Sequence, residues 1–189
     1  MRQGYLKPNV SISVIADRPC PAVQFCENNS INHQLVKYTR ESNKSLIDAI
    51  ALINPDVIIT TWHKIIDPET LNTFKNKFYN LHYSLLPAFR GYIGIKPIKL
   101  AHELNCRFIG STVHEVTEKV DGGKILAQFV MKRSSDLNHD IELIFRNSCL
   151  LLANTLNILF NNSLLNLLPG YYNIWQFEPP LTFDITIFD

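Results

Sequence analysis

Three polar side chains in two separate segments are of types that could act together on one small group: Asn80, His82 and Asp121. Asn80 and His82 lie two residues apart, so in an extended strand both side chains leave the same face. Asp121 precedes two glycines, as expected for a loop after a strand. An amide and an imidazole can stabilise an oxygen that becomes anionic, and a carboxylate can pair with the imidazole or accept a proton.

Each of these residues also has a structural explanation. Asn80 could cap a turn, His82 could be a hydrogen-bonded core histidine, and Asp121 could open a Gly-Gly turn. Residue types alone therefore indicate only a candidate cluster. Whether the three side chains can lie together depends on the strands and loops that carry them.

The first half of the chain alternates short apolar runs with helical patterns. This βαβαβ rhythm predicts a parallel sheet with helices on both faces, and ligands then bind beyond the carboxyl ends of the strands. The run over 56–62 is nearly all apolar, so we expect a strand buried on both faces. The expected strands cover 10–16, 34–38, 56–62 and 78–82, and the expected helices cover 22–27, 45–53 and 67–77.

The second half predicts a mixed arrangement. A helix over 96–104 is followed by two extended strands, 108–116 and 124–131, around the loop that carries Asp121. A long helix should run from about 137 to 160 with its Leu, Ile and Phe side chains on one face. The aromatic, proline-rich tail from Pro169 could end in a strand. The expected fold class is α/β, with a Rossmann-like, mostly parallel sheet, a mixed C-terminal part and a single domain over 1–189.

Composition narrows the classes of partner. The chain has 189 residues, 46% of them hydrophobic, and a formal net charge of +1, which favours a globular protein without a nucleic-acid partner. No apolar run reaches the roughly 18 residues of a membrane span, and the first residues lack the apolar core of a secretion signal. We therefore expect a cytoplasmic protein with no membrane partner.

The cysteines and the remaining histidines predict no further chemistry. We expect four free, buried thiols, because the cysteines form no CxxC pair, and no metal site. His114 stands within an expected strand, where we favour a structural role, and His102 starts no zinc-binding pattern, so its helix reads as a surface helix. The histidines without an expected function are His33, His102 and His139.

Two linked motifs make the candidate cluster more specific. Residues 80–91 read Asn-Leu-His-x-Ser-Leu-Leu-Pro-x-Phe-x-Gly, residues 110–116 read Gly-x-Thr-Val-His-x-Val, and residues 120–128 read Val-Asp-x-Gly-x-Ile-x-x-Gln. The pattern resembles phosphoribosylglycinamide formyltransferases and, more broadly, the formyltransferase superfamily that uses 10-formyltetrahydrofolate. The resemblance runs from about Val10 to the long C-terminal helix, and the Thr-Val-His segment favours the glycinamide branch.

The resemblance implies a role for each residue of the cluster. Asn80 matches the asparagine that donates to the formyl oxygen. His82 matches the histidine that stabilises the developing oxyanion and moves protons, and Asp121 matches the aspartate that pairs with that histidine. A nearby carboxylate should favour the charged imidazole. No covalent intermediate and no metal are required.

The resemblance also implies where the folate and the amine bind. The pterin would lie between two loops, with Phe78 and Val116 as apolar walls or as plain core residues. Arg90 is either a contact to an anionic substrate or a surface arginine, and Ser84 shapes the turn after the histidine. The expected folate site comprises His63, Lys64, Ile65, Ile66, Phe78, Val116, Thr117, Glu118, Lys119 and Val120, and the expected substrate contacts are Tyr83, Ser84 and Arg90.

Three departures from the family pattern all concern the amine substrate. The chain shows no Gly-Asn-Gly-Ser-like loop for a substrate phosphate, so we expect either a truncated start at residues 1–9 or a lost phosphate site. Cys149 stands about where the family has a glutamate, although Glu142 lies on the same helix. The segment 91–101 is about three residues longer than the pattern. A missing strand would also leave sheet backbone uncovered, and a homodimer is one arrangement that would cover it.

These features favour formyl transfer from 10-formyltetrahydrofolate to glycinamide ribonucleotide in purine biosynthesis. Two alternatives stay open. One is N-formylation of another amine, such as a nucleotide-linked amino sugar, and the other is a folate-binding module without turnover. The lost phosphate loop supports both alternatives, and the intact cluster of Asn80, His82 and Asp121 opposes the second.

Overall fold

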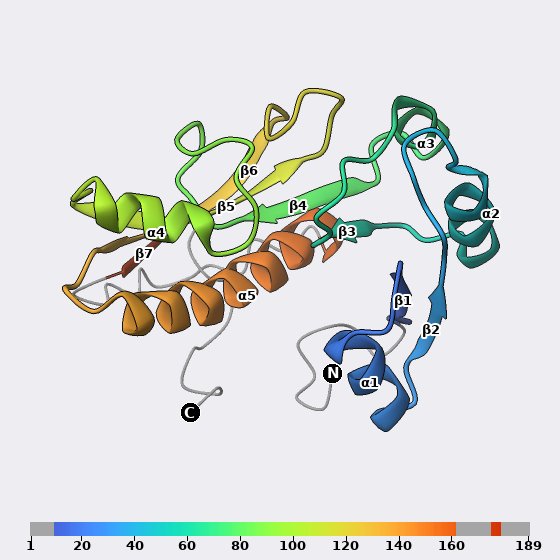
Figure 1. Ribbon diagram of the computed structural model, residues 1–189, viewed down its shortest axis with the longest axis horizontal. Coiled ribbons are helices and arrows are strands. Elements are labelled where there is room, and N and C mark those ends of the chain that lie inside the picture. The colour runs from blue at the N-terminus through green and yellow to red at the C-terminus, as the bar shows by residue number, and fades with distance from the viewer. Residues whose placement is uncertain (1–9, 162–174, 179–189) are drawn as a thin grey trace. The chain divides into compact units, whose positions relative to one another are not determined.

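The computed structural model describes residues 10–161 and 175–178, and the chain divides into two compact units. The first unit comprises Met1–Ile58 and Lys64–Lys77, and the second comprises Ile59–His63 and Phe78–Asp189. Helices and strands alternate along the chain from β1 to β5, and β6 then follows β5 directly (Figure 1). The two units are described separately below.

A parallel pair of strands forms the sheet of the first unit. Strand β1 (Ser13–Ala16) leads through helix α1 (Pro21–Asn28) to strand β2 (Asn32–Leu35), which pairs parallel with β1. This is the expected βαβ connection, although β2 begins two residues earlier than the pattern indicated. Helix α2 (Lys44–Ile53) follows as expected.

Local sequence explains where the helices of this unit begin and end. Pro21 occupies the first turn of α1, where the missing N–H costs no hydrogen bond. Helix α2 ends at Asn54, which adopts a left-handed conformation. Helix α3 (Pro68–Thr73) ends four residues before the expected Lys77, because Phe74 leaves helical geometry.

A buried carboxylate organises the loop before α3. Asp67 accepts hydrogen bonds from the backbone N–H of Thr70 (2.9 Å) and from the side chains of Asn43 (2.7 Å) and Tyr38 (3.1 Å). Burial raises the pKa of Asp67, but the hydrogen bonds outweigh burial, so its pKa lies below the ordinary value. Burial also raises the pKa of Tyr38 to about 12. Asp67 is therefore a helix cap and the centre of a polar network in one residue.

Asp67→Ala should lower the free energy of unfolding by about 1–3 kcal/mol at pH 7, because the substitution removes the cap and leaves buried donors unpaired. Since the pKa of Asp67 is lowered by folding, its contribution is present above the unfolded pKa and is lost as the pH falls through the folded value. The urea midpoint of the variant and of the wild type should therefore converge in acid. Asp48→Ala, at an exposed position of α2, is the control, and an equal loss in both variants would contradict the role of Asp67.

Five strands form the sheet of the second unit, in the order β3-β4-β5-β6-β7. The strands are β3 (Ile58–Thr60), β4 (Phe78–His82), β5 (Phe108–Glu115), β6 (Ile125–Lys132) and β7 (Trp175–Glu178). Pairing from β4 to β7 is antiparallel, which is the expected mixed part and is more extensive than the pattern indicated. Strand β3 is shorter than expected, and the expectation of burial on both faces is wrong, because Ile59 is 39% exposed.

Close packing inside this sheet requires a glycine. A Cβ atom at Gly110 would lie 1.9 Å from the backbone oxygen of Phe129 on β6 and 2.9 Å from Leu85. The glycine that opens the Gly-x-Thr-Val-His motif is therefore explained by the approach of β5 to its neighbours.

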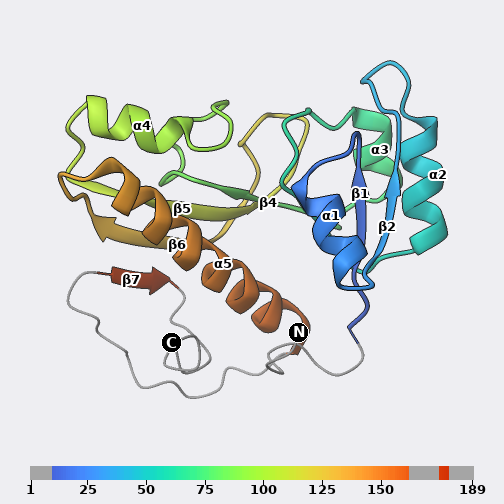
Figure 2. The ribbon, with the colours of Figure 1, turned by 60° about the horizontal axis from the view of Figure 1, so that its bottom comes forward.

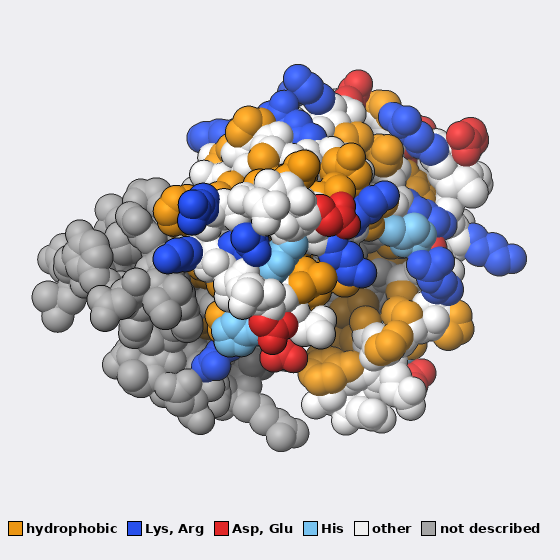
Figure 3. All heavy atoms as spheres, turned by 60° about the vertical axis from the view of Figure 1, so that its left-hand side comes forward, with side chains coloured by type: hydrophobic (Ala, Val, Ile, Leu, Met, Phe, Trp, Pro, Cys, Tyr) orange, Lys and Arg blue, Asp and Glu red, His pale blue; other side chains and the backbone are white. Residues whose placement is uncertain are grey.

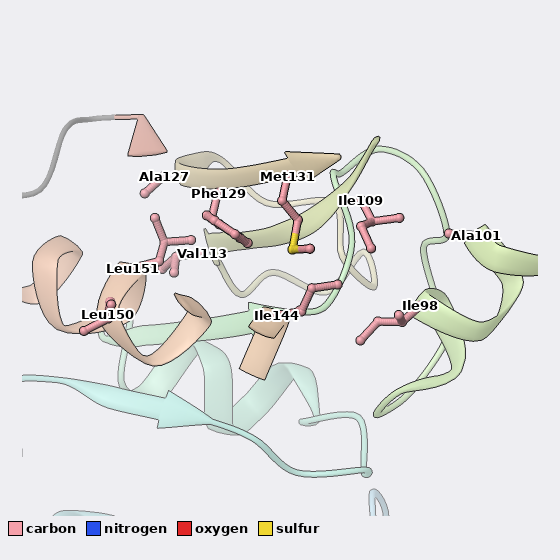
Figure 4. Packing of buried hydrophobic residues seen from close by; sticks show 10 residues of the cluster. All are labelled: Ile98, Ala101, Ile109, Val113, Ala127, Phe129, Met131, Ile144, Leu150 and Leu151. Carbon is pink, nitrogen blue, oxygen red and sulfur yellow. The ribbon is translucent and has the colours of Figure 1, made fainter. Parts of the chain in front are cut away.

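Two helices complete the second unit. Helix α4 (Lys96–Glu103) and helix α5 (Leu137–Asn161) both contact β5, and α5 also contacts β6 and runs along the sheet (Figures 1 and 2). Asp136 accepts hydrogen bonds from the backbone of Asn138 and His139 and so caps the start of α5. Figure 4 shows the core between these elements, which consists of Ile98, Ala101, Ile109, Val113, Ala127, Phe129, Met131, Ile144, Leu150 and Leu151.

The buried face of α5 differs from the expected apolar face. Asp140, Asn147 and Ser148 are fully buried alongside the core residues, whereas Phe145 is 59% exposed. His102, expected on a surface helix, lies 2.8 Å from the carboxylate of Asp140 and so joins α4 to α5. Within the described residues, α5 is long and apolar enough to span a membrane, which the sequence pattern had not indicated, but Ile144, Leu150 and Leu151 place it in the core.

The cysteines are free, as expected, but only Cys26 is buried, and Cys149 is exposed. The expectation of four buried thiols is therefore wrong. Lysine and arginine side chains are dispersed among apolar and acidic ones on the face shown in Figure 3, in keeping with the small net charge.

Candidate active site

The antiparallel pairing of β4 with β5 brings the candidate residues together. Asn80 lies directly opposite His114, and His82 lies directly opposite Thr112. Opposed residues, and residues two apart on one strand, share a face of the sheet. Asn80, His82, Thr112 and His114 therefore project from the same face, and the loop between β5 and β6 adds Asp121.

His82 is held between two acceptors. Its Nε2 atom lies 3.1 Å from the carbonyl oxygen of Phe89, and its Nδ1 atom lies 3.6 Å from Oδ2 of Asp121. The side chain is almost fully buried. An imidazole with an acceptor at each nitrogen is fixed in orientation and can carry a proton on either one.

Asp121 lies between two imidazoles. Its Oδ2 atom faces His82 and accepts a 2.7 Å hydrogen bond from the backbone N–H of Gly91, and its Oδ1 atom lies 3.7 Å from Nε2 of His114. The backbone of Asp121 has a φ of 49°, a left-handed conformation that aspartate tolerates better than most residues. His82 and Asp121 therefore lie close together, as expected, and His114 lies beside the same carboxylate.

Asn80 is engaged differently from its expected role. Its amide nitrogen donates to the backbone oxygen of Thr60 (2.6 Å) and lies 3.2 Å from the Thr60 hydroxyl, and its amide oxygen faces His114 at 3.2 Å. A donor aimed at a formyl oxygen would require the amide to give up part of its contact with Thr60. Both residues that contact the Asn80 side chain, Thr60 and His114, lie outside the set of site residues expected from the sequence.

A signal for His114 was present in the chain. Gly110, Thr112 and His114 are spaced two residues apart, so all three lie on one face of β5. Thr112 and His114 pair with His82 and Asn80, so this is the face that carries the candidate cluster. The register of β5 against β4, which places His114 at the site, cannot be read from the chain alone. Thr60 belongs to none of the motifs described above, so no sequence signal pointed to it.

The charge state of His82 results from opposing effects. Burial lowers the pKa of His82, the nearby Asp121 carboxylate and the Phe89 carbonyl raise it, and His114 lowers it. The net effect is a pKa below the ordinary value. The expected influence of the carboxylate is present, but burial outweighs it, so the resting imidazole is neutral near pH 7.

A hydrogen-bonded turn fixes the segment after His82. The Thr112 hydroxyl donates to the backbone oxygen of Ser84 (2.7 Å). It accepts from the backbone N–H of Leu86 (3.1 Å) and from the side-chain amide of Gln128 (3.1 Å). The Ser84 hydroxyl donates to the Ala88 oxygen at 2.6 Å. Ser84 therefore has the turn-shaping contact that the sequence suggested. The glutamine of the Val-Asp-x-Gly-x-Ile-x-x-Gln motif serves the same turn.

The other expected substrate residues occupy different environments. Burial raises the pKa of Tyr83, with a further contribution from Cys149, and Tyr83 packs against the core of the second unit. Arg90 is exposed beside the cluster. Substrate contact by Tyr83, Ser84 and Arg90 stays a prediction.

The expected folate residues fall in both units. Lys64, Ile65 and Ile66 belong to the first unit, where the Lys64 ammonium donates to the Tyr38 oxygen (2.7 Å) and pairs with Asp17 (2.9 Å). His63, Phe78, Val116 and the loop 117–120 belong to the second unit. There, Phe78 is buried and its oxygen accepts from the Val116 N–H, and the loop 117–120 is exposed. Folate binding by these residues also stays a prediction.

Comparison with known proteins gives the family. Residues 7–138 match the formyl transferase family. The chain is 33% identical over 138 residues to a chloroplastic phosphoribosylglycinamide formyltransferase of Vigna unguiculata, covering 69% of this chain and 44% of that protein. It is 32% identical over 136 residues to a formyltetrahydrofolate deformylase of Escherichia coli strain K12, covering 69% of this chain and 48% of that protein. The chain belongs to the formyl transferase family, and it spans about half the length of these curated relatives.

Solved structures confirm the fold class. A phosphoribosylglycinamide formyltransferase from Bacillus halodurans aligns with a TM-score of 0.74 at 23% identity, over 88% of this chain and 89% of that one. The enzyme of the same name from Anaplasma phagocytophilum aligns with a TM-score of 0.71 at 18% identity, over 79% of this chain and 74% of that one. The fold is the α/β fold of the formyltransferases. Among the residues that the structure describes, no group of three or more His, Cys, Asp and Glu side chains could hold a metal ion.

The charge of His82 can be measured directly. Its imidazole should titrate below 6.5 in the folded protein, because burial outweighs the carboxylate. Asp121→Asn should lower this pKa further, and His114→Gln should raise it, because Asp121 raises the pKa of His82 and His114 lowers it. Chemical shifts of 15N-labelled imidazoles across a pH series provide the measurement. A His82 pKa above 6.5 in the wild type would show that burial does not outweigh the carboxylate.

Proposed function

We propose that this protein transfers the formyl group of 10-formyltetrahydrofolate to a primary amine. The observation that carries the proposal is the position of Asp121 between His82 and His114, with Asn80 on the same face of the sheet. Such a cluster supplies proton donors and a proton acceptor around one small carbonyl, which formyl transfer requires. Membership of the formyl transferase family supports the same reaction.

The reaction proceeds in two bond changes. The amine nitrogen forms a bond to the formyl carbon, and the formyl oxygen becomes anionic. The bond between the formyl carbon and the folate nitrogen then breaks, the folate nitrogen gains a proton and the amine nitrogen loses one. Asp121 accepts the proton of the amine, directly or through water, and His82 donates to the anionic oxygen.

Burial of His82 suits this sequence of events. A neutral imidazole costs little in a buried site, and the negative charge that grows on the formyl oxygen raises its affinity for a proton. The stabilisation is therefore larger in the transition state than in the ground state, as catalysis requires. His114 acts as a positioning residue, because its Nε2 atom faces both Asn80 and Asp121.

Glycinamide ribonucleotide is the first candidate for the acceptor, in purine biosynthesis, because relatives at 31–33% identity carry the name phosphoribosylglycinamide formyltransferase. Water is the second candidate, since other relatives at comparable identity are named formyltetrahydrofolate deformylase. With water as the nucleophile, the same cluster would release formate and tetrahydrofolate. We place the activity in the cytoplasm, and the homodimer stays a prediction.

His82→Ala and Asp121→Asn should each lower kcat by about 10²–10⁴-fold, because each removes a group that acts in the transition state. The dissociation constant of a folate analogue should change much less. Stopped-flow turnover and fluorescence titration measure the two quantities. His139→Ala, at an exposed position of α5, is the matched histidine control. Wild-type turnover in His82→Ala would refute the mechanism.

The acceptor can be identified by mass spectrometry of the candidate amines after incubation. The full chain is incubated with 10-formyltetrahydrofolate and either glycinamide ribonucleotide, a nucleotide-linked amino sugar or no amine. We expect one amine to gain one formyl group, with little formate formed in its absence. Formate release without any formylated amine would identify a deformylase. Binding of a folate analogue without either product would identify a folate-binding module.

A further inference from the structure

The side-chain amide of Asn80 is compatible with its surroundings in one orientation. One of its polar atoms lies 2.6 Å from the backbone oxygen of Thr60, and a backbone oxygen can only accept a hydrogen bond. The same atom lies 3.2 Å from the Thr60 hydroxyl, which donates its own proton to the backbone oxygen of Tyr79. The atom that faces Thr60 is therefore the amide nitrogen, and the amide oxygen Oδ1 faces His114 at 3.2 Å.

As a consequence, both ring nitrogens of His114 face oxygen acceptors. The Nε2 atom lies 3.2 Å from Oδ1 of Asn80 and 3.7 Å from Oδ1 of Asp121. The Nδ1 atom lies 2.8 Å from the backbone oxygen of Glu115. A neutral imidazole carries one N–H, so in either tautomer a nitrogen lone pair would point at an oxygen, within a residue that is 2% exposed. A ring with a proton on each nitrogen satisfies all of these contacts.

The charge of such a ring has its counter-charge beside it. The Asp121 carboxylate and the hydrogen-bond acceptors both favour the charged form of His114, and together they oppose the cost of burial. His82 has a different environment. Its Nε2 atom can donate to the Phe89 oxygen at 3.1 Å, but its Nδ1 atom lies 3.6 Å from Asp121, which is longer than a hydrogen bond. One proton therefore suffices for His82, and repulsion between the imidazoles favours a single charge.

We propose that His114 carries a proton on both ring nitrogens and is the resident cation of the cluster, because Thr60 orients the Asn80 amide against it. The charge on His114 keeps Asp121 ionised, so that the carboxylate can accept the proton of the attacking amine. It also adds a positive charge to the face of the sheet where the formyl oxygen becomes anionic. His114 is thus a positioning residue. These consequences rest on the proposed formyl transfer, whereas the protonation of the resting protein does not.

Nuclear magnetic resonance of the resting protein tests the inference without turnover. The full chain is labelled with 15N-histidine, and long-range correlations from the ring C–H protons report both nitrogens of each imidazole near neutral pH. Loss of signals in His114→Gln assigns the His114 ring. We expect two protonated nitrogens with similar chemical shifts. A His114 ring with one unprotonated nitrogen, which would have a clearly separate shift, would overturn the inference.

Three variants test why the ring is charged. Asn80→Leu removes the oxygen acceptor, and Asp121→Asn removes the counter-charge, so each should leave His114 with a single proton at the same pH. Thr60→Val is the matched control, because it removes the hydroxyl and keeps the backbone oxygen that orients Asn80. It should leave both protons on His114.

A doubly protonated ring in all three variants would show that the charge does not depend on Asn80 or Asp121, and would overturn the inference. Circular dichroism establishes that each variant is folded, and the wild-type spectrum decides the protonation even where a variant does not fold. A doubly protonated His114 in a chain that formylates no amine would support the inference and refute formyl transfer. Formyl transfer by a chain with a neutral His114 would do the reverse.

Discussion

A single carboxylate between two imidazoles is the interaction on which the site depends. Asp121 faces His82 with one oxygen and His114 with the other, and the backbone of Gly91 fixes the first oxygen. The carboxylate favours a proton on His82, whereas burial and the second imidazole disfavour it. Burial is the largest of these effects, so the pKa of His82 lies below its ordinary value, and the proton affinity of the imidazole depends on the charges that face it.

The register of β4 against β5 determines whether the side chains of this cluster lie together. Strands β4 and β5 are antiparallel, and a slip of one residue would move His114 and Thr112 to the opposite face, away from Asn80 and His82. The close approach at Gly110, the hydrogen bonds of Thr112 and the packing of α5 on β5 all oppose such a slip. Gly110, Thr112 and Gln128 of the two motifs therefore serve the geometry of the strands and of the turn after His82.

Much of the local structure could be predicted from the chain. Strand β4 has its expected bounds, α2, α4, β5 and α5 differ from expectation by one residue at one end, and β6 is shifted by one residue at both ends. These elements have strong periodicity and clear end signals, which act over a few residues. Burial was predicted less well: α5 buries Asp140 and Asn147 and exposes Phe145, because the face that a helix buries depends on its neighbours.

The residue types of the candidate cluster, their spacing and the family pattern can be read from the chain, since a motif is a property of consecutive residues. Three features depend on the folded chain: His114 lies in the cluster, the Asn80 amide donates to Thr60, and burial outweighs the effect of the Asp121 carboxylate on the pKa of His82. Each of these depends on strand register or on solvent exclusion, which arise from contacts between residues far apart in the chain.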